Sequence, residues 1–195
     1  MDDVDQQVVA AVCAGDTGRY AELVDRYQQP ALRLAYGLLG NAQDAEEAAQ
    51  DAFVSAYQAL RGFRGGAKFS TWFYRIVVNK CRDAQRSRAR RIAPLAIAPG
   101  DDDQDSVFDF LEDPAAGPGE LAQRGDVARA LSAAIRALPH QQREAIVLHH
   151  LHGFSVDDAA AAMGCRAGTV KSHLFRAHGA LRARLHPLLR PEDVS

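Results

Sequence analysis

Cysteine, tryptophan and methionine are scarce in this chain of 195 residues. It contains three cysteines, one tryptophan and two methionines. The cysteines, at positions 13, 81 and 165, are an odd number, lie far apart and form no CxxC pair. This pattern argues against a disulfide framework and against a cysteine-based zinc site. It favours a reducing compartment, and we expect the protein to be cytoplasmic.

Long hydrophobic runs are also absent. No apolar segment approaches the ~20 residues that a membrane-spanning helix requires. The amino terminus, MDDVDQQVV, is acidic where a signal peptide would be basic. No strand-like alternation of convincing length occurs either, so the sequence predicts an all-α protein without a membrane span of its own.

Motifs of catalysis are missing as well. Neither a Ser/His/Asp arrangement nor a glycine-rich phosphate loop stands out, so we expect no catalytic residue, no enzyme activity and no cofactor. His149 and His152 lie three positions apart and invite a metal-site interpretation. No carboxylate or thiol stands at a spacing that would complete the site, and we expect no bound metal.

Charge is distributed unevenly along the chain, although the net charge is only −2. Residues 41–60 contain four acids and no Lys or Arg, whereas residues 61–91 contain ten Lys/Arg and one acid, a local net charge of +9. Such asymmetry indicates two partners, one basic and one a polyanion.

The basic stretch 61–91 also contains five aromatic residues, at 63, 69, 72, 73 and 74. Cations neutralise phosphates and aromatic faces stack on unpaired bases, so the combination favours a single-stranded nucleic acid. Two plainer interpretations stand beside this one. Trp72 and Ile76 fall at helical spacing and fit a buried core, and the run 86–91 also fits a solvated helix end.

Apolar periodicity predicts helices over residues 4–14, 17–39 and 42–60, with Pro30 breaking or kinking the second. Asn41 and Asp44 form a predicted capping box at the start of the third. After a glycine-containing loop, Ser70 or Thr71 is expected to cap a basic helix that reaches about residue 88.

Residues 92–125 contain four prolines and eight acids with one base, and this composition predicts an extended linker. The expected fold is therefore all-α, with two small helical domains (1–91 and 126–195) joined by an acidic flexible linker (92–125). Further helices are predicted from 126 to Pro139, then to Gly153, then over 156–163, capped by Ser155 with Asp158.

The predicted helix 156–163 and the last predicted helix, over about 167–185, have the spacing of a DNA-reading helix-turn-helix. Ala160 supplies the small residue at the crossing, Gly164 the turn, and Val170 and Leu174 the buried side of the second helix. The opposite side is polar and basic, and no acid occurs between Gly164 and His186. A major-groove reader fits this face, and an amphipathic helix with a solvated basic face is the alternative.

Two segments resemble a known family. NAQDAEEAAQDAF (41–53) followed by LRGFRGGAKFSTWFYRIVVNKCRD (60–83), and LPHQQREAIVLHHLHGFSVDDAAAAMGCRAGTVKSHLFRAHGALRARL (138–185), are similar to regions 2 and 4 of bacterial extracytoplasmic-function sigma factors of the sigma-70 family. The resemblance implies core RNA polymerase and promoter DNA as partners. It further implies contacts with the β′ clamp helices and the β flap, and often control by an anti-sigma protein.

The resemblance also implies roles for individual residues. Those implied in clamp binding are Asp44, Glu47, Gln50 and Asp51. Those implied in capturing a flipped base of the −10 element, or in holding its strand, are Phe63, Arg64, Lys68, Phe69, Ser70, Thr71, Arg75, Asn79, Lys80, Arg82 and Arg86. Those implied in reading the −35 element are Arg166, Gly168, Thr169, Lys171, Ser172, His173, Phe175 and Arg176.

Two other functions compete with this hypothesis. The Gly-Thr-Val-Lys helix (168–171) also resembles that of LuxR-type regulators, so a stand-alone helix-turn-helix transcriptional regulator is the first alternative. It assigns no role to the basic stretch 61–91. A nucleic-acid enzyme acting with a divalent metal is the second. The linker, in turn, is expected to act either as a nucleic-acid mimic in the RNA exit path or as a passive spacer.

Overall fold

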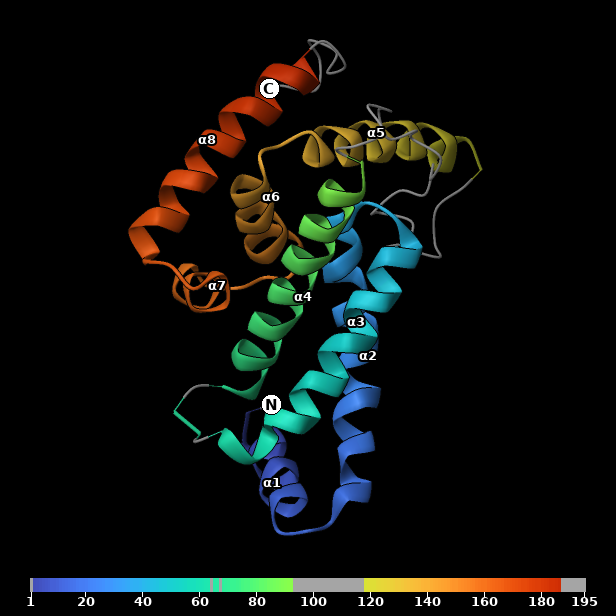
Figure 1. Cartoon of the computed structure of the whole chain (residues 1–195). Helices are drawn as coiled ribbons and strands as arrows, with labels where there is room; N and C mark the ends of the chain where they lie inside the picture. Colours follow the sequence, from blue (N-terminus) through green and yellow to red (C-terminus); the bar gives the residue numbers. More distant parts are fainter. Residues whose placement is uncertain (1, 64, 67, 93–117, 187–195) are drawn as a thin grey trace.

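The computed structural model describes residues 2–63, 65–66, 68–92 and 118–186, and the part that it describes is helical without any strand (Figure 1). The N-terminal domain contains α1 (Asp2–Cys13), α2 (Tyr20–Leu39), α3 (Ala42–Ala59) and α4 (Phe69–Ile92), with short 3-10 turns at Thr17–Arg19 and Leu60–Gly62. The C-terminal domain contains α5 (Pro118–Arg136), α6 (His140–Ile146), α7 (Val156–Met163) and α8 (Ala167–Leu185), and a π-helical turn, Val147–Leu151, extends α6. The all-α fold is confirmed.

Local capping chemistry explains where several helices begin and end. The Asn41 side chain accepts a hydrogen bond of 2.7 Å from the Asp44 backbone N–H, and the Ser155 hydroxyl accepts one of 3.0 Å from the Asp158 N–H. Each contact satisfies a backbone donor that the first turn leaves unpaired. Gly164 ends α7 with a φ of +70°, in the left-handed region that glycine adopts without strain. These boundaries agree with the sequence prediction.

Other helix boundaries differ from those that the sequence predicted. Pro30 does not break α2, which continues to Leu39 because Tyr27, Ala31 and Leu34 bury its inner face on both sides of the proline. The helix α4 begins at Phe69, so Ser70 and Thr71 lie in its first turn instead of capping it.

The helix α5 begins at Pro118, eight residues before the predicted start at 126, and proline is well suited to a first helical turn. Residues 118–125 are therefore helical, where an extended linker was predicted. The rest of the predicted linker, from 93 to 117, lies outside the described residues.

In the N-terminal domain, α4 packs against α2 and α3 (Figure 1). Alanines line the inner face of α3, and their small side chains let the helices approach closely. Phe69 and Phe73 of α4 fill the space beside Tyr27, with ring centroids 5.4 and 5.6 Å from it. An aromatic core thus fixes the first turns of α4.

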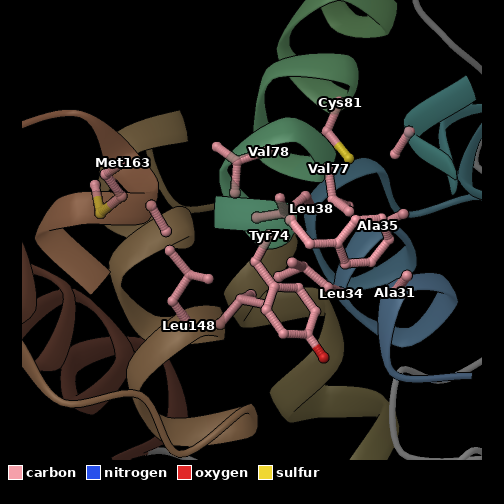
Figure 2. Close-up of a cluster of buried hydrophobic side chains, with 14 of the residues drawn as sticks. Ala31, Leu34, Ala35, Leu38, Tyr74, Val77, Val78, Cys81, Leu148 and Met163 are labelled. Atoms are coloured by element: carbon pink, nitrogen blue, oxygen red, sulfur yellow. The ribbon is translucent and has the colours of Figure 1, made fainter. Parts of the chain in front are cut away.

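The two domains also pack directly against each other, and their buried side chains form one cluster. In Figure 2, Tyr74, Val77 and Val78 of α4 lie between Leu34 and Leu38 of α2 on one side and Leu148 and Met163 of the C-terminal domain on the other. The contact is close at Gly37, where a Cβ atom would come within 3.0 Å of Val147 Cγ1. The helix α4 therefore packs against the N-terminal helices α2 and α3 and also against the C-terminal domain (Figure 1).

Candidate nucleic-acid interface

The helix α8 is buried on one side only. Val170, Leu174 and Ala177 face the core, and Ala160 of α7 is buried at 5% exposure beside them. The helix-turn-helix geometry expected from the spacing is therefore present. Of the residues implied in reading DNA, all but His173 are exposed: Arg166, Gly168, Thr169, Lys171, Ser172, Phe175 and Arg176.

The exposed face of α8 offers chemistry suited to the major groove. Gly168 leaves the backbone open, since nothing lies within 4 Å of where its Cβ would be. The Ser172 hydroxyl donates to the Gly168 carbonyl at 3.0 Å and keeps its lone pairs available to an incoming donor. Phe175 is 81% exposed and presents an apolar ring to solvent.

The helix α4 and the residue before it contain a second group of polar and basic side chains. Lys68, Arg75, Asn79 and Arg86 are exposed, and Ser70 and Lys80 are half-buried. Phe63 is half-buried and packs its ring 5.1 Å from that of Trp72, at the beginning of the helix. Arg64 lies outside the described residues.

The residues of the basic stretch 61–91 differ in burial, and the sequence did not predict which of them would be buried. Phe69 is only 2% exposed and Thr71 only 7%, so neither is accessible to a base in this conformation. Trp72 and Ile76, expected to be buried, are half-buried instead and pack against the edge of the core. Four rings within six positions cover more than one face of a helix, which periodicity alone could not resolve.

Arg82, expected to hold phosphates, contacts the C-terminal domain. Its Nε donates to Glu144 Oε1 and its Nη2 to Glu144 Oε2, both at 2.7 Å, and Nη2 also reaches the Met163 carbonyl at 3.1 Å. The hydrogen bonds to Glu144 raise the pKa of the guanidinium further above its ordinary value. The Thr71 hydroxyl likewise donates to Asp158 Oδ1 at 3.1 Å. Glu144 and Asp158 were not among the predicted site residues.

The acidic face of α3 is accessible. Glu47, Gln50 and Asp51 are exposed, while Asp44 is half-buried and accepts hydrogen bonds from Asn41 Nδ2 at 2.7 Å and Arg88 Nη1 at 3.5 Å. A groove of about 340 Å³ runs between α3 and α4. Its charged lining residues are Asp44, Glu47, Asp51, Lys80, Asp83 and Arg90.

Cys81 of α4 is a buried free thiol. Burial raises the pKa of the Cys81 thiol to about 12, so this cysteine is an inert part of the core. Among the residues that the structure describes, no group of three or more His, Cys, Asp or Glu could hold a metal ion. No helix in the same part of the chain is long and apolar enough to cross a membrane.

Comparison with known proteins agrees with this architecture. Residues 23–91 match Sigma-70 region 2 and residues 128–181 match Sigma-70 region 4. The chain is 36% identical to the RNA polymerase sigma-H factor of Pseudomonas aeruginosa, over 95% of this chain and 96% of that protein. It is 34% identical to the ECF RNA polymerase sigma-E factor of Escherichia coli K12, again over 95% and 96%.

Two solved structures are also similar. One is the sigma factor RpoE in complex with the anti-sigma factor NepR from Bartonella quintana, with a TM-score of 0.66, 27% identity and coverage of 85% of this chain and 97% of that one. The other is CnrH in complex with the cytosolic domain of CnrY, with a TM-score of 0.63, 26% identity and coverage of 94% and 97%. The chain therefore belongs to the sigma-70 family of RNA polymerase sigma factors, in its extracytoplasmic-function group.

Proposed function

We propose that this sigma factor directs core RNA polymerase to promoters by reading the −35 element with α8 and by capturing a flipped base of the −10 element with the start and middle of α4. The observation that carries the proposal is the one-sided exposure of both helices. The exposed side of α8 has hydroxyls, a glycine and basic residues without an acid. The helix α4 combines Asn79 with Arg75 and Arg86, and Lys68 directly precedes it.

The chemistry of each face suits its target. Arginine forks onto guanine and hydroxyls meet phosphates or base edges, as a duplex reader requires. Extruding a base costs a few kcal/mol, which hydrogen bonds to its Watson–Crick edge must recover. The amide of Asn79 has both a donor and an acceptor for that purpose.

The polymerase contacts follow from charge. The exposed acids Glu47 and Asp51, with Gln50 and Asp44, fit the basic clamp helices of the β′ subunit, and opposite charge speeds such an encounter. The C-terminal domain would rest on the β flap. One structural relative, the sigma factor RpoE, is in complex with the anti-sigma factor NepR, and we extend that kind of control to this chain.

Sequencing the transcripts that core polymerase makes in vitro with this chain tests the proposal. We expect new start sites that share an element near −10 and another near −35. Unchanged transcription, together with no complex in a pull-down with core polymerase, would instead favour a stand-alone regulator.

The variant Asn79→Ala tests the assignment of the −10 reader. It should slow promoter opening by the polymerase complex about tenfold or more, because a lost amide pair with a base is worth about 1 to 3 kcal/mol. Binding to closed duplex should change little. Gln28→Ala removes an exposed amide from α2 and serves as the matched control. Equal losses in opening and in duplex binding would refute the assignment.

A further inference from the structure

Two histidines of the C-terminal domain face each other at a contact that the proposed function does not use. His150 lies in the π-helical turn Val147–Leu151, and His178 lies in α8, 28 positions later. Their Nε2 atoms are 2.8 Å apart, and their ring centroids are 4.9 Å apart. Both residues are exposed, so a small ion can reach the two nitrogens from solvent.

Sequence spacing drew attention to His149 and His152, but the π-helical turn brings a different histidine to α8. In this turn the His152 backbone N–H donates to the Val147 carbonyl at 3.1 Å, five residues back instead of four. Such widened turns are rare and occur often at functional sites. The Nδ1 atom of His149 lies 2.6 Å from the Phe154 carbonyl, so the backbone holds this ring. His150 is therefore the histidine of the turn that meets α8.

On α8, His178 lies at the edge of the buried side. It follows Leu174 by four positions, and residues at that spacing share a face of a helix. Leu174 and Ala177 are buried, and α8 packs there against α6. His178 is not among the residues proposed to read DNA, so a substitution at this position leaves that set intact.

Two facing imidazole nitrogens suit a divalent transition metal, because imidazole is a preferred ligand of Zn²⁺, Ni²⁺ and Cu²⁺. Zn–N bonds of about 2.0 to 2.1 Å place two ligand nitrogens of a tetrahedral site about 3.3 Å apart. The nitrogens of His150 and His178, now 2.8 Å apart, therefore need to separate by only about 0.5 Å to admit the ion. Exposed side chains can make that adjustment without disturbing the core.

The protonation of the pair also favours a metal. Burial, followed by the charges of His149 and His178, lowers the pKa of His150. The ring therefore stays neutral at neutral pH, and neutral imidazole is the form that binds a metal. Without a metal, one neutral ring donates its Nε2 proton to the other. When the ion binds, the donating ring moves that proton to Nδ1 by exchange with water, so the chain loses no net proton.

The coordination is open. Among the residues that the structure describes, no group of three or more His, Cys, Asp or Glu could hold a metal ion, so these two nitrogens have no third partner of that kind there. Water then fills the other positions, in contrast to structural zinc sites with four protein ligands. An open site exchanges its ion with the medium, and its occupancy follows the free metal concentration.

We propose that His150 and His178 form a binding site for a divalent transition-metal ion such as Zn²⁺ or Ni²⁺, and that the bound ion ties α8 to the turn after α6. Each imidazole supplies one Nε2 ligand, and water supplies the rest. Because the ion binds the folded arrangement, it stabilises the C-terminal domain, and more so at higher metal concentration. The inference does not depend on the proposed −10 and −35 contacts.

Calorimetric titration of the full, tag-free chain with Zn²⁺ and, separately, with Ni²⁺ tests the site. Every sample has Cys13→Ser and Cys165→Ser, because accessible thiols also bind zinc. We expect one ion per chain and a midpoint of thermal unfolding that rises with added metal. His150→Gln and His178→Gln should each weaken binding at least tenfold, since the loss of an outer-shell partner alone costs about 10- to 100-fold.

His186→Gln is the matched control, because it removes an exposed histidine at the end of α8 and should leave the affinity unchanged. The altered positions are exposed, and thermal unfolding without metal verifies that each variant folds. No heat of binding with either metal would overturn the proposal. Equal affinity in the two site variants and the parent chain, or an equal loss in His186→Gln, would overturn it as well.

Paramagnetic Co²⁺ locates the ion independently of the affinity. In the NMR spectrum it should broaden the backbone amide signals nearest to His150 and His178, and His178→Gln should abolish that pattern. Broadening centred on other residues would place the ion elsewhere and overturn the proposal.

Discussion

Buried carboxylates stand at two places in the described part of the molecule, Asp5 and Glu144, and an arginine from another helix pairs with each. Asp5 of α1 is 1% exposed, pairs with Arg26 and accepts a hydrogen bond of 2.5 Å from the Tyr27 hydroxyl. Burial, followed by the hydrogen bond to Asp5, raises the pKa of Tyr27 far above its ordinary value. The hydroxyl is thus a permanent donor that ties α1 to α2.

Asp5→Ala should therefore destabilise the protein. It leaves the Tyr27 hydroxyl, on a residue that is 4% exposed, without its acceptor, and a buried unpaired polar group costs about 1 to 3 kcal/mol. Urea unfolding followed by circular dichroism measures the change. Glu22→Ala, in an exposed pair, should stay within about 0.5 kcal/mol, and similar losses in the two variants would contradict the role given to Asp5.

At the scale of the element, α7 is a short helix that packs against α4 and depends on the residues at its two ends. It has eight residues, from Val156 to Met163, and isolated helices of that length are unstable in water. Ser155 caps its start and Gly164 ends it. The Ser155 hydroxyl also donates to Asp158 Oδ2 at 2.7 Å, so the cap positions the carboxylate that meets Thr71.

Ser155→Ala should lower the free energy of unfolding by about 0.5 to 2 kcal/mol, the usual effect of removing a helix cap. Ser155→Asn keeps an acceptor at the cap and should retain most of the stability. Urea titration of both variants measures the difference, and an equally stable alanine variant would show that packing alone holds α7 in place.

Local patterns in the sequence predicted most of these elements. The Asn41–Asp44 and Ser155–Asp158 boxes, the Gly164 turn and the buried side of α8 all depend on residues three to eight positions apart. The burial of Phe69 and Thr71 was not predictable in the same way. It depends on which face of α4 meets α2 and which meets α7, and helical periodicity identifies a face without naming its partner.

The Arg82–Glu144 pair is the clearest example of a contact that local sequence patterns could not predict. Arg82 and Glu144 are separated by 62 positions, and in the sequence each looks like an ordinary charged residue of a surface helix. Their pairing follows from the packing of α6 and α7 against α4, which a reading of isolated segments could not supply. The sequence therefore predicted the helices that carry the exposed polar residues, but not the contacts between the two domains.

At the scale of the whole molecule, the shared core couples the two domains. Because Tyr74, Val78, Leu148 and Met163 belong to one cluster, separating the domains exposes apolar surface on both. All seven histidines lie in the C-terminal domain. His152 is half-buried near the boundary between the domains, with its ring centroid 6.2 Å from that of Tyr74. Proton binding there should be unfavourable in the folded form.

The protein should consequently lose stability on mild acidification. Burial, with a smaller contribution from the charge of Arg33, lowers the pKa of His152 to about 4, against about 6.5 for an unfolded histidine. Above pH 6.5 the ring is neutral in both states and contributes nothing. Between pH 6.5 and 4 the unfolded chain takes up a proton that the folded chain refuses, so the free energy of unfolding falls as the pH falls.

We expect a loss of about 1 to 2 kcal/mol between pH 7 and pH 5, measured by urea unfolding at each pH. His152→Gln should reduce this slope without abolishing it, because burial also lowers the pKa of His140 and His150. His186→Gln, at the exposed end of α8, should leave the slope unchanged. If His152→Gln retained the full slope, the acid sensitivity would arise from groups other than His152.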